Sequence, residues 1–99
     1  MANAIVRIYG PFSWSQPRGQ LGLMVGEGHP WFIGDFTDGS VVFQVSAHPS
    51  RQNNQQGLAV TDLRVDYARS GGPVVNFVVR NIGPTAVSYY SLFITGTGF

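Results

Sequence analysis

The stretch PVVNFVVRNI, residues 73–82, decides the fold. Apolar Val75, Phe77 and Val79 stand at every second position, and most positions between them are apolar as well. A period of two is the pattern of a β-strand, because successive side chains point to opposite faces of the sheet. A strand that is apolar on nearly both sides is covered on both. The stretch therefore predicts a central β-strand.

The segments on either side of this strand repeat its pattern. Gly- and Pro-containing turns at 70–72 and 83–85 separate it from two more predicted strands, at 58–67 and 86–95. Short turns of this kind join antiparallel neighbours. The second half of the chain is therefore predicted to be a three-stranded meander.

The first half contains more glycine and proline, and its strands are predicted to be shorter. Residues 4–9 alternate as a strand that Gly10-Pro11 ends, and 12–19 is predicted to be a loop or an irregular edge strand, since Pro17 cannot donate to a ladder. Apolar residues alternate again over 20–25, which predicts a second strand.

The pair Asp38-Gly39 stands between two apolar runs, which is the pattern of a two-residue type I′ hairpin over 31–45. If these two residues form the turn, the register is fixed. One face of the hairpin then carries Phe32, Phe36, Val41, Phe43 and Val45.

Two further irregularities are predicted. Residues 48–57 carry no apolar side chain other than one proline, so this segment is predicted to be an exposed, mobile loop. Within 58–67 the apolar phase shifts, and a β-bulge near Thr61-Asp62 would reconcile its two halves.

The strand count defines the class of fold. About seven strands in 99 residues, with turns every 8 to 12 residues, predict an all-β protein. We expect a single domain, 1–99, built as an antiparallel two-sheet β-sandwich that is either immunoglobulin-like or a small jelly roll.

The composition excludes several classes of function. The chain has no cysteine, and its net charge of +1 is too small to attract nucleic acid. The apolar runs are far shorter than the roughly 20 residues of a membrane-spanning helix, and the first residues lack the pattern of a secretory signal peptide. We therefore predict no nucleic-acid partner and no transmembrane segment. The sequence has no signal peptide, which fits either a cytoplasmic protein or a fragment of an exported one, so the localisation is left open.

Charged residues make up only 11% of the chain, against about 25% in an ordinary soluble domain. Aromatic residues reach 13%. Interfaces between proteins are depleted in charge and enriched in aromatic residues and arginine. The composition therefore predicts that part of the surface is a contact, most simply with further copies of the same chain.

Part of the second half resembles a known family. Val60-Thr61-Asp62-Leu63-Arg64-Val65, the run from Val75 to Gly83 with its Asn81-Ile82-Gly83 turn, and Ala86-Val87 look like the second half of bacterial immunoglobulin-like accessory modules of the CARDB type. The resemblance covers residues 58–95. It implies an immunoglobulin-like sandwich with an adhesion or scaffold role.

No pattern of catalytic residues stands out. The two histidines, His29 and His48, each precede a proline in a predicted loop, and no serine lies in a recognisable nucleophile motif. A zinc site from His29, His48 and Asp35 is conceivable, since three ligands and a water would suffice, but no ligand spacing favours it. We predict no enzyme, no metal and no cofactor.

The candidate binding residues are aromatic residues with polar neighbours near the N-terminal loops: Trp14, Gln16, His29, Trp31 and Asp35. We expect Trp31 to fill the core and Trp14 to be exposed or at an interface. An indole outside a core either anchors an interface or stacks on a sugar. The main hypothesis is a non-enzymatic, self-associating interaction module with a glycan or protein partner, and lectin-like carbohydrate binding as a further use of these rings.

Two alternatives remain open. One is a purely structural or assembly subunit without a small ligand. The other is a membrane-surface or pore-forming protein that inserts Phe12 and Trp14 as interfacial rings.

Overall fold

The computed structural model describes residues 4–34, 36–49, 56–69 and 71–98. This part of the chain is all-β and contains no helix. Its six strands are β1 (Ile5–Ser15), β2 (Gly28–Ile33), β3 (Ser40–Pro49), β4 (Leu58–Tyr67), β5 (Pro73–Asn81) and β6 (Tyr89–Gly98).

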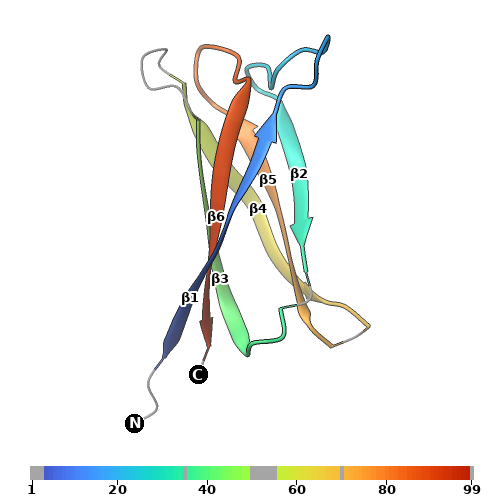
Figure 1. The fold of residues 1–99 in the computed structure, drawn as a ribbon, viewed down its shortest axis with the longest axis vertical. Coiled ribbons are helices and arrows are strands. Elements are labelled where there is room, and N and C mark those ends of the chain that lie inside the picture. Colours follow the sequence, from blue (N-terminus) through green and yellow to red (C-terminus); the bar gives the residue numbers. More distant parts are fainter. Residues whose placement is uncertain (1–3, 35, 50–55, 70, 99) are drawn as a thin grey trace.

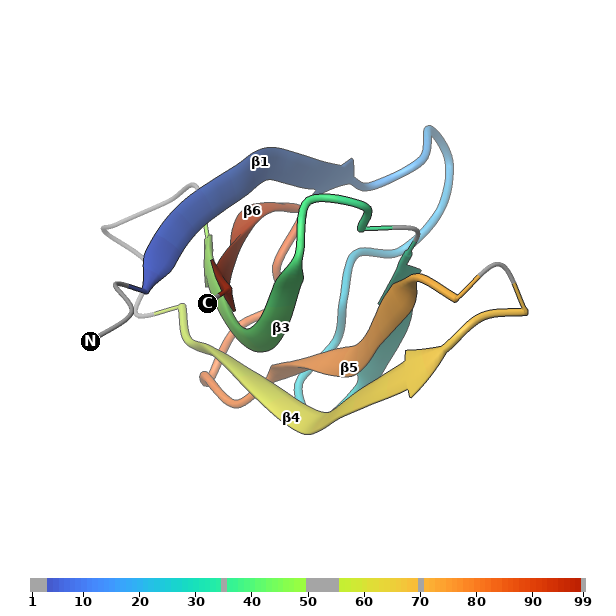
Figure 2. The same cartoon turned by 90° about the horizontal axis from the view of Figure 1, so that it is seen from below.

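The strands form two antiparallel sheets of three strands each, which confirms the predicted two-sheet sandwich (Figure 1). One sheet has the order β1-β6-β3 and the other the order β2-β5-β4. Seen from below, β1, β6 and β3 form one layer, and β2, β5 and β4 form the other (Figure 2). The predicted central strand, β5, is indeed the middle strand of its sheet, and β6 takes the same place in the other.

The core lies between these two central strands. Inward side chains of β5 and β6 are fully or almost fully buried: Val75, Phe77 and Val79 from one sheet, and Tyr90, Leu92 and Ile94 from the other. Phe43 of β3 and the loop residues Leu23 and Val87 complete the buried cluster. The strict alternation of β-branched, leucine and aromatic residues therefore sets which face of each strand is inside.

The predicted strand over 20–25 is wrong, which accounts for six strands rather than seven. This segment is a loop with one isolated β-bridge, in which Leu23 and Val87 exchange backbone hydrogen bonds of 2.8 and 2.9 Å. Leu23 is buried while Leu21 and Val25 are exposed. Only one of the three alternating apolar side chains therefore enters the core.

The predicted hairpin over 31–45 is also wrong. β2 pairs with β5 and β3 pairs with β6, so the Asp38-Gly39 connection crosses from one sheet to the other. Gly39 has the expected positive φ of 87°, but a type I′ turn needs positive φ at both central residues, and Asp38 lacks it. Asp38 Oδ1 instead accepts a 3.0 Å hydrogen bond from the Ser40 backbone N–H.

The hairpin error also misplaced Phe32. The residue pairs with Asn76 of β5 and is exposed, whereas Phe43, which was expected on the same face, is buried. The predicted meander fails in the same way: β4 and β5 are paired neighbours, but β5 and β6 lie in different sheets.

Other irregularities agree better with the sequence. The predicted bulge in β4 is confirmed, because the register shifts between Thr61 and Arg64, and Asp62 has a φ of 56°. β1 does not end at Gly10 but continues to Ser15 as an edge strand with a register shift between Tyr9 and Phe12. This matches the irregular edge strand that was one of the two expectations for that segment.

The predicted loop over 48–57 is shorter than expected on one side, because β3 extends to Pro49. Residues 50–55, the middle of that prediction, lie outside the described residues. Gln56 and Gly57 are partly buried, and Gln56 donates a 3.2 Å hydrogen bond to the Ala86 carbonyl.

Candidate functional site

Three of the five predicted site residues meet between the sheets, around the hydroxyl of Tyr90. Trp31 Nε1–H donates a 2.9 Å hydrogen bond to this hydroxyl, and His29 Nδ1 lies 2.8 Å from it. Trp14 stacks on the Tyr90 ring with a centroid distance of 5.5 Å and meets the His29 ring edge-on at 4.5 Å. We call these four residues the Tyr90 cluster.

The Tyr90 cluster joins the two sheets, because Trp14 and Tyr90 come from one and His29 and Trp31 from the other. When His29 carries its proton on Nε2, the Tyr90 hydroxyl donates to Nδ1 while it accepts from Trp31, so the hydroxyl, the indole N–H and Nδ1 are all paired. Such complete pairing lets a polar group lie in a core without a large penalty.

Burial perturbs both titratable members of this cluster. It lowers the pKa of the His29 imidazole, and the nearby Glu27 carboxylate opposes that shift. It raises the pKa of the Tyr90 hydroxyl, against the hydrogen bond from Trp31. Both groups are therefore held in their neutral forms, His29 as an imidazole and Tyr90 as a phenol.

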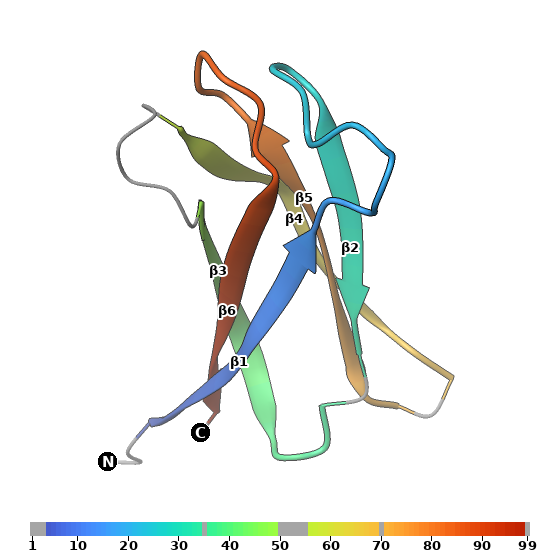
Figure 3. The same cartoon turned by 45° about the horizontal axis from the view of Figure 1, so that its top comes forward.

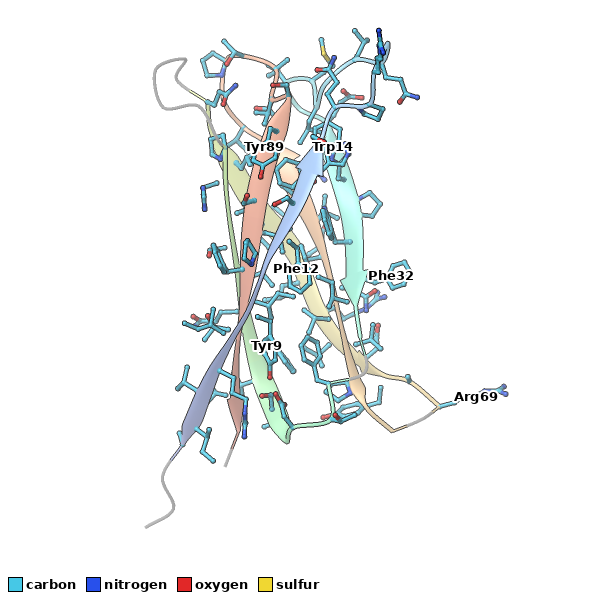
Figure 4. All side chains as sticks on the ribbon, viewed as in Figure 1. Tyr9, Phe12, Trp14, Phe32, Arg69 and Tyr89 are labelled. Atoms are coloured by element: carbon cyan, nitrogen blue, oxygen red, sulfur yellow. The ribbon has the colours of Figure 1, made fainter. Side chains whose placement is uncertain are left out.

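The rings of the Tyr90 cluster serve the interior rather than the solvent. Trp31 packs against the core as expected, and its ring also lies parallel to Phe77 at 6.2 Å. Trp14 packs against the core too and is only partly exposed (Figure 4). Trp14 is therefore not an exposed residue; exposure was one of the two expectations for it, and its location at an interface stays a prediction.

Gln16 lies outside the Tyr90 cluster. Its side-chain amide donates to the Gln20 carbonyl within the loop, and its backbone N–H donates to Ser88 O at 2.7 Å. Asp35, the fifth predicted residue, lies outside the described residues. The structure therefore brings three of the five predicted residues together, places Gln16 elsewhere and leaves the prediction for Asp35 untested.

Next to the Tyr90 cluster, the loop that contains Leu23 borders an open hollow of about 590 Å³. His29 and Glu27 line part of it. The Glu27 carboxylate stabilises the turn in which it lies, because its Oε1 accepts a 2.9 Å hydrogen bond from the Met24 N–H. The hollow therefore presents mainly backbone and apolar loop side chains.

A buried asparagine that the sequence reasoning did not select fixes this end of the sandwich. Asn81 is 1% exposed, and its Nδ2 donates to the carbonyls of Leu23 at 2.8 Å and Thr85 at 2.9 Å. Its Oδ1 accepts from the Gly83 N–H at 3.0 Å. One amide thus fastens together the two loops that lie side by side in Figure 3. The Asn81-Ile82-Gly83 turn was the available signal.

Among the described residues, the outer face of the β1-β6-β3 sheet contains no arginine, aspartate or glutamate. It consists of the side chains that alternate with the buried ones: Val6, Ile8, Ser13, Ser15, Val42, Gln44, Ser46, His48, Tyr89, Ser91, Phe93, Thr95 and Thr97. We call it the neutral face. Ile8 is 71% exposed, and Val6 and Val42 are more than half exposed.

The neutral face also has local order. The hydroxyl groups of Ser13, Ser91 and Tyr89 lie within 3.2 to 3.4 Å of one another, and these bonds lower the pKa of Tyr89. His48 stacks on Phe93 at a centroid distance of 6.4 Å. Sequence reasoning missed this face because it needs the pairing of β1, β6 and β3, which no local pattern specifies.

The outer face of the other sheet is different. Its outward residues are Gly28, Pro30, Phe32, Ala59, Thr61, Arg64, Asp66, Val74, Asn76, Val78 and Arg80. We call it the charged face. Arg64 Nε and Asn76 Nδ2 each donate a 2.9 Å hydrogen bond to Asp66 Oδ2. A second hollow, of about 320 Å³, lies beside this network and Phe32.

Within the described ranges, no group of three or more His, Asp and Glu side chains could hold a metal ion. The same residues include no helix long and apolar enough to cross a membrane. No protein-family model, curated protein or solved structure matches this chain.

Proposed function

We propose that this protein is a non-enzymatic interaction module that self-associates through the neutral face. The observation that carries the proposal is the distribution of charge: three adjacent strands present a continuous outer face without an arginine, aspartate or glutamate. Water solvates such a face poorly at Val6, Ile8 and Val42, and covering them with a second copy removes that apolar surface from water.

The size of the face supports the same proposal. A standard interface covers about 800 Å² of each partner, which is about one eighth of the 6376 Å² surface of this chain. Serine, threonine and glutamine on the face supply hydrogen bonds without the desolvation penalty of burying ions.

The edges of the sheets support it as well. On the charged face, Pro30 lies in the edge strand β2, and the bulge at Asp62 interrupts the edge strand β4. Proline and bulges are devices that protect a sheet edge against pairing with another chain. The edge strand β1 carries exposed apolar residues at Ile5, Val6 and Ile8, before its own irregularity. The first part of β1, before that irregularity, therefore carries neither device.

A non-enzymatic role is supported by the state of the two histidines. His29 is bonded to Tyr90, and His48 stacks on Phe93. A nucleophile is activated when an imidazole is hydrogen-bonded to a serine or a carboxylate. In the described part of the chain, neither imidazole has such a bond. The scaffold role implied by the CARDB-like resemblance agrees with the proposal and stays a prediction.

The test is sedimentation velocity from about 10 µM to about 1 mM, a range that covers weak and moderate affinities. We expect the wild-type mass to rise with concentration. Ile8→Asp, which introduces a charge on the neutral face, should remain monomeric at concentrations at which the wild type associates.

The matched control is Phe32→Asp. It makes the same change at a side chain of similar exposure, 76% against 71%, on the opposite face. This variant should associate like the wild type. A wild type that stays monomeric throughout, or two variants that lose association equally, would overturn the proposal. Circular dichroism checks that both variants are folded.

A membrane-surface role is a second candidate, supported by a different observation. The loop end of the sandwich exposes Leu21, Met24, Val25 and Ile82. Phe12 and Trp14, the rings first considered for insertion, pack against the core instead. Flotation with neutral lipid vesicles tests this candidate, and Leu21→Asp should abolish any flotation that the wild type displays.

A further inference from the structure

Phe32 is the most exposed aromatic ring of the described residues, with 76% of its surface accessible. Figure 4 shows its side chain pointing away from β2 toward the outside of the molecule. The alternation along β2 explains this, because His29, Trp31 and Ile33 occupy the inward positions. The ring therefore contributes nothing to the core, and leaving it in water has a free-energy cost that the fold does not require.

The ring borders a hollow rather than a flat surface. Phe32, Pro30 and Val78 provide apolar walls, and Arg64, Asp62 and Asn76 provide polar ones. The volume of about 320 Å³ is at the lower end of the roughly 300–1,000 Å³ typical of small-molecule sites. An apolar wall combined with a few convergent polar groups is the usual composition of such sites.

The polar groups are held in position before any ligand arrives. Asp66 Oδ2 accepts from both Arg64 Nε and Asn76 Nδ2 at 2.9 Å, so one carboxylate orients the guanidinium and the amide together. These bonds leave the Asn76 Oδ1 acceptor and the Arg64 Nη donors for a ligand. The bulge at Asp62 is what re-aims the strand just before Arg64.

The charges around the hollow indicate the class of ligand. Arg64 is the one cation of its lining, and the carboxylates of Asp62 and Asp66 lie beside it, so an anion would meet two like charges. A ligand with an apolar face for Phe32 and paired donor and acceptor groups for Asn76 and Arg64 fits all the walls. A pyranose ring has this chemistry, with C–H groups on one face and hydroxyl groups around its edge.

We propose that the hollow beside Phe32 binds a neutral carbohydrate, with one pyranose ring stacked on Phe32 and its hydroxyls bonded to Asn76 and Arg64. The site lies on the charged face, opposite the neutral face. It therefore does not depend on self-association, and either proposal can fail without the other. It also differs from the carbohydrate site first predicted around Trp14 and Trp31, whose rings are turned inward.

The experiment is an array of neutral oligosaccharides built from glucose, mannose, xylose, galactose and N-acetylglucosamine, with sialylated and sulfated glycans as an anionic arm. The best neutral oligosaccharide is then titrated by NMR and calorimetry. We expect binding of at least one neutral oligosaccharide, with shift changes centred on β2, β4 and β5. Phe32→Ala and Asn76→Ala should each weaken its binding at least tenfold, and Phe32→Tyr should retain it.

Ile8→Ala is the matched control, because it removes an equally exposed apolar side chain from the neutral face. It should bind the oligosaccharide like the wild type. Three results would overturn the proposal: no neutral oligosaccharide bound above background, a preference for the anionic arm, or equal loss in Phe32→Ala and Ile8→Ala. In the same variants, sedimentation of Phe32→Ala should match the wild type, which separates this site from self-association.

Discussion

The two outer faces of this sandwich are built from the same kind of strand but carry opposite surfaces. The neutral face presents valine, isoleucine and hydroxyl side chains, whereas the charged face presents two arginines, an aspartate and an exposed phenylalanine beside a hollow. The few charged residues of the chain are therefore unevenly distributed over its two outer faces.

The difference teaches that the placement of the few charged residues, and not only their number, determines what each face can bind. If the few charges were spread evenly, both faces would be moderately hydrated and neither would favour a particular partner. Keeping charges off one outer face leaves that face suited to a flat, dry contact, and placing Arg64, Asp66 and Arg80 on the other makes a balanced polar site possible there. The predictions below test whether the faces are independent in function although they share one core.

The largest effect should come from that shared core. Phe77→Ala and Leu92→Ala remove fully buried side chains from β5 and β6, and each should lower the free energy of unfolding by about 3 kcal/mol or more. Urea unfolding measures this loss. Because the core supports both faces, both self-association and carbohydrate binding should weaken together. A variant that loses only one activity at full stability would break the picture of a single shared interior.

Two neighbouring tyrosines give the next largest contrast. Tyr90→Phe removes the hydroxyl that pairs with Trp31 and His29, leaving two ring nitrogens without their partner, and should cost about 1 to 3 kcal/mol. Tyr89→Phe removes a hydroxyl on the neutral face and should change stability by no more than about 0.5 kcal/mol. Chemical denaturation of the pair measures the difference. Equal losses would contradict the opposite orientations of these residues.

Acid should lower the stability of the whole fold, and so affect both faces, through the protonation of His29. The fold lowers the pKa of this imidazole, so the unfolded chain takes up the proton more readily. The stability due to neutral His29 is therefore complete above the ordinary pKa of 6.5 and is lost as pH falls below it. Urea midpoints between pH 8 and pH 5 should fall for the wild type, and less for His29→Gln.

Asp38→Asn is the control for that titration. Hydrogen bonds from Tyr9 and the Ser40 backbone lower the pKa of Asp38 to about 2, so its stabilisation is lost only as pH falls from 3.8 toward that value. Its substitution should leave the slope between pH 8 and pH 5 unchanged. A steeper or flatter slope there would show that His29 is not the group responsible.

A change of salt concentration should produce the smallest effect. It distinguishes the two faces directly, because only the charged face contains an ion pair that salt can screen. Association through the neutral face should change little between about 0.05 M and about 0.5 M NaCl, because no ion pair forms or breaks there. The Arg64–Asp66 pair is exposed, so its contribution to stability should be no more than about 1 kcal/mol and should shrink with salt. A strongly salt-dependent association constant would contradict a charge-free interface.

The second half of the fold could be predicted well from the sequence. The bounds of β4 agree with the prediction, and those of β5 differ by one residue. The reason is that the alternation of β-branched and aromatic residues can be recognised in the sequence without knowing which strands pair. The bulge at Thr61-Asp62 followed from a break in the same signal. Local patterns are therefore sufficient for the bounds of these strands. The prediction that β5 is covered on both sides is wrong, because Asn76, Val78 and Arg80 lie on the outer charged face.

The pairing of strands could not be predicted in the same way. Asp38-Gly39 has the composition of a tight turn whether the chain returns to the same sheet or crosses to the other one. The choice depends on β5 and β6, which are distant in sequence and offer better partners to β2 and β3. This one error reversed the position of Phe32 and concealed the site beside it.

The candidate binding residues were predicted in type and misjudged in orientation. Trp14, His29 and Trp31 do come together, because aromatic residues at alternate positions of facing strands meet across a sandwich. Whether such rings face inward or outward depends on the parity of each strand relative to the core. That parity was correct for β5, which needed no partner to assign, and wrong for β2, which did.

The placement of β6 has a consequence for biosynthesis. β1 and β3 do not pair with each other, and each pairs only with β6. Ile5 therefore cannot form its strand pairing until Gly98 has been synthesised. On the ribosome, which makes the chain from its N-terminus, these two strands emerge long before their shared neighbour. The strands of the β2-β5-β4 sheet are all synthesised before β6. The last step of assembly is therefore the pairing of β6 with both β1 and β3. This step is non-local and slow, so we expect chaperones to protect the chain until it is complete.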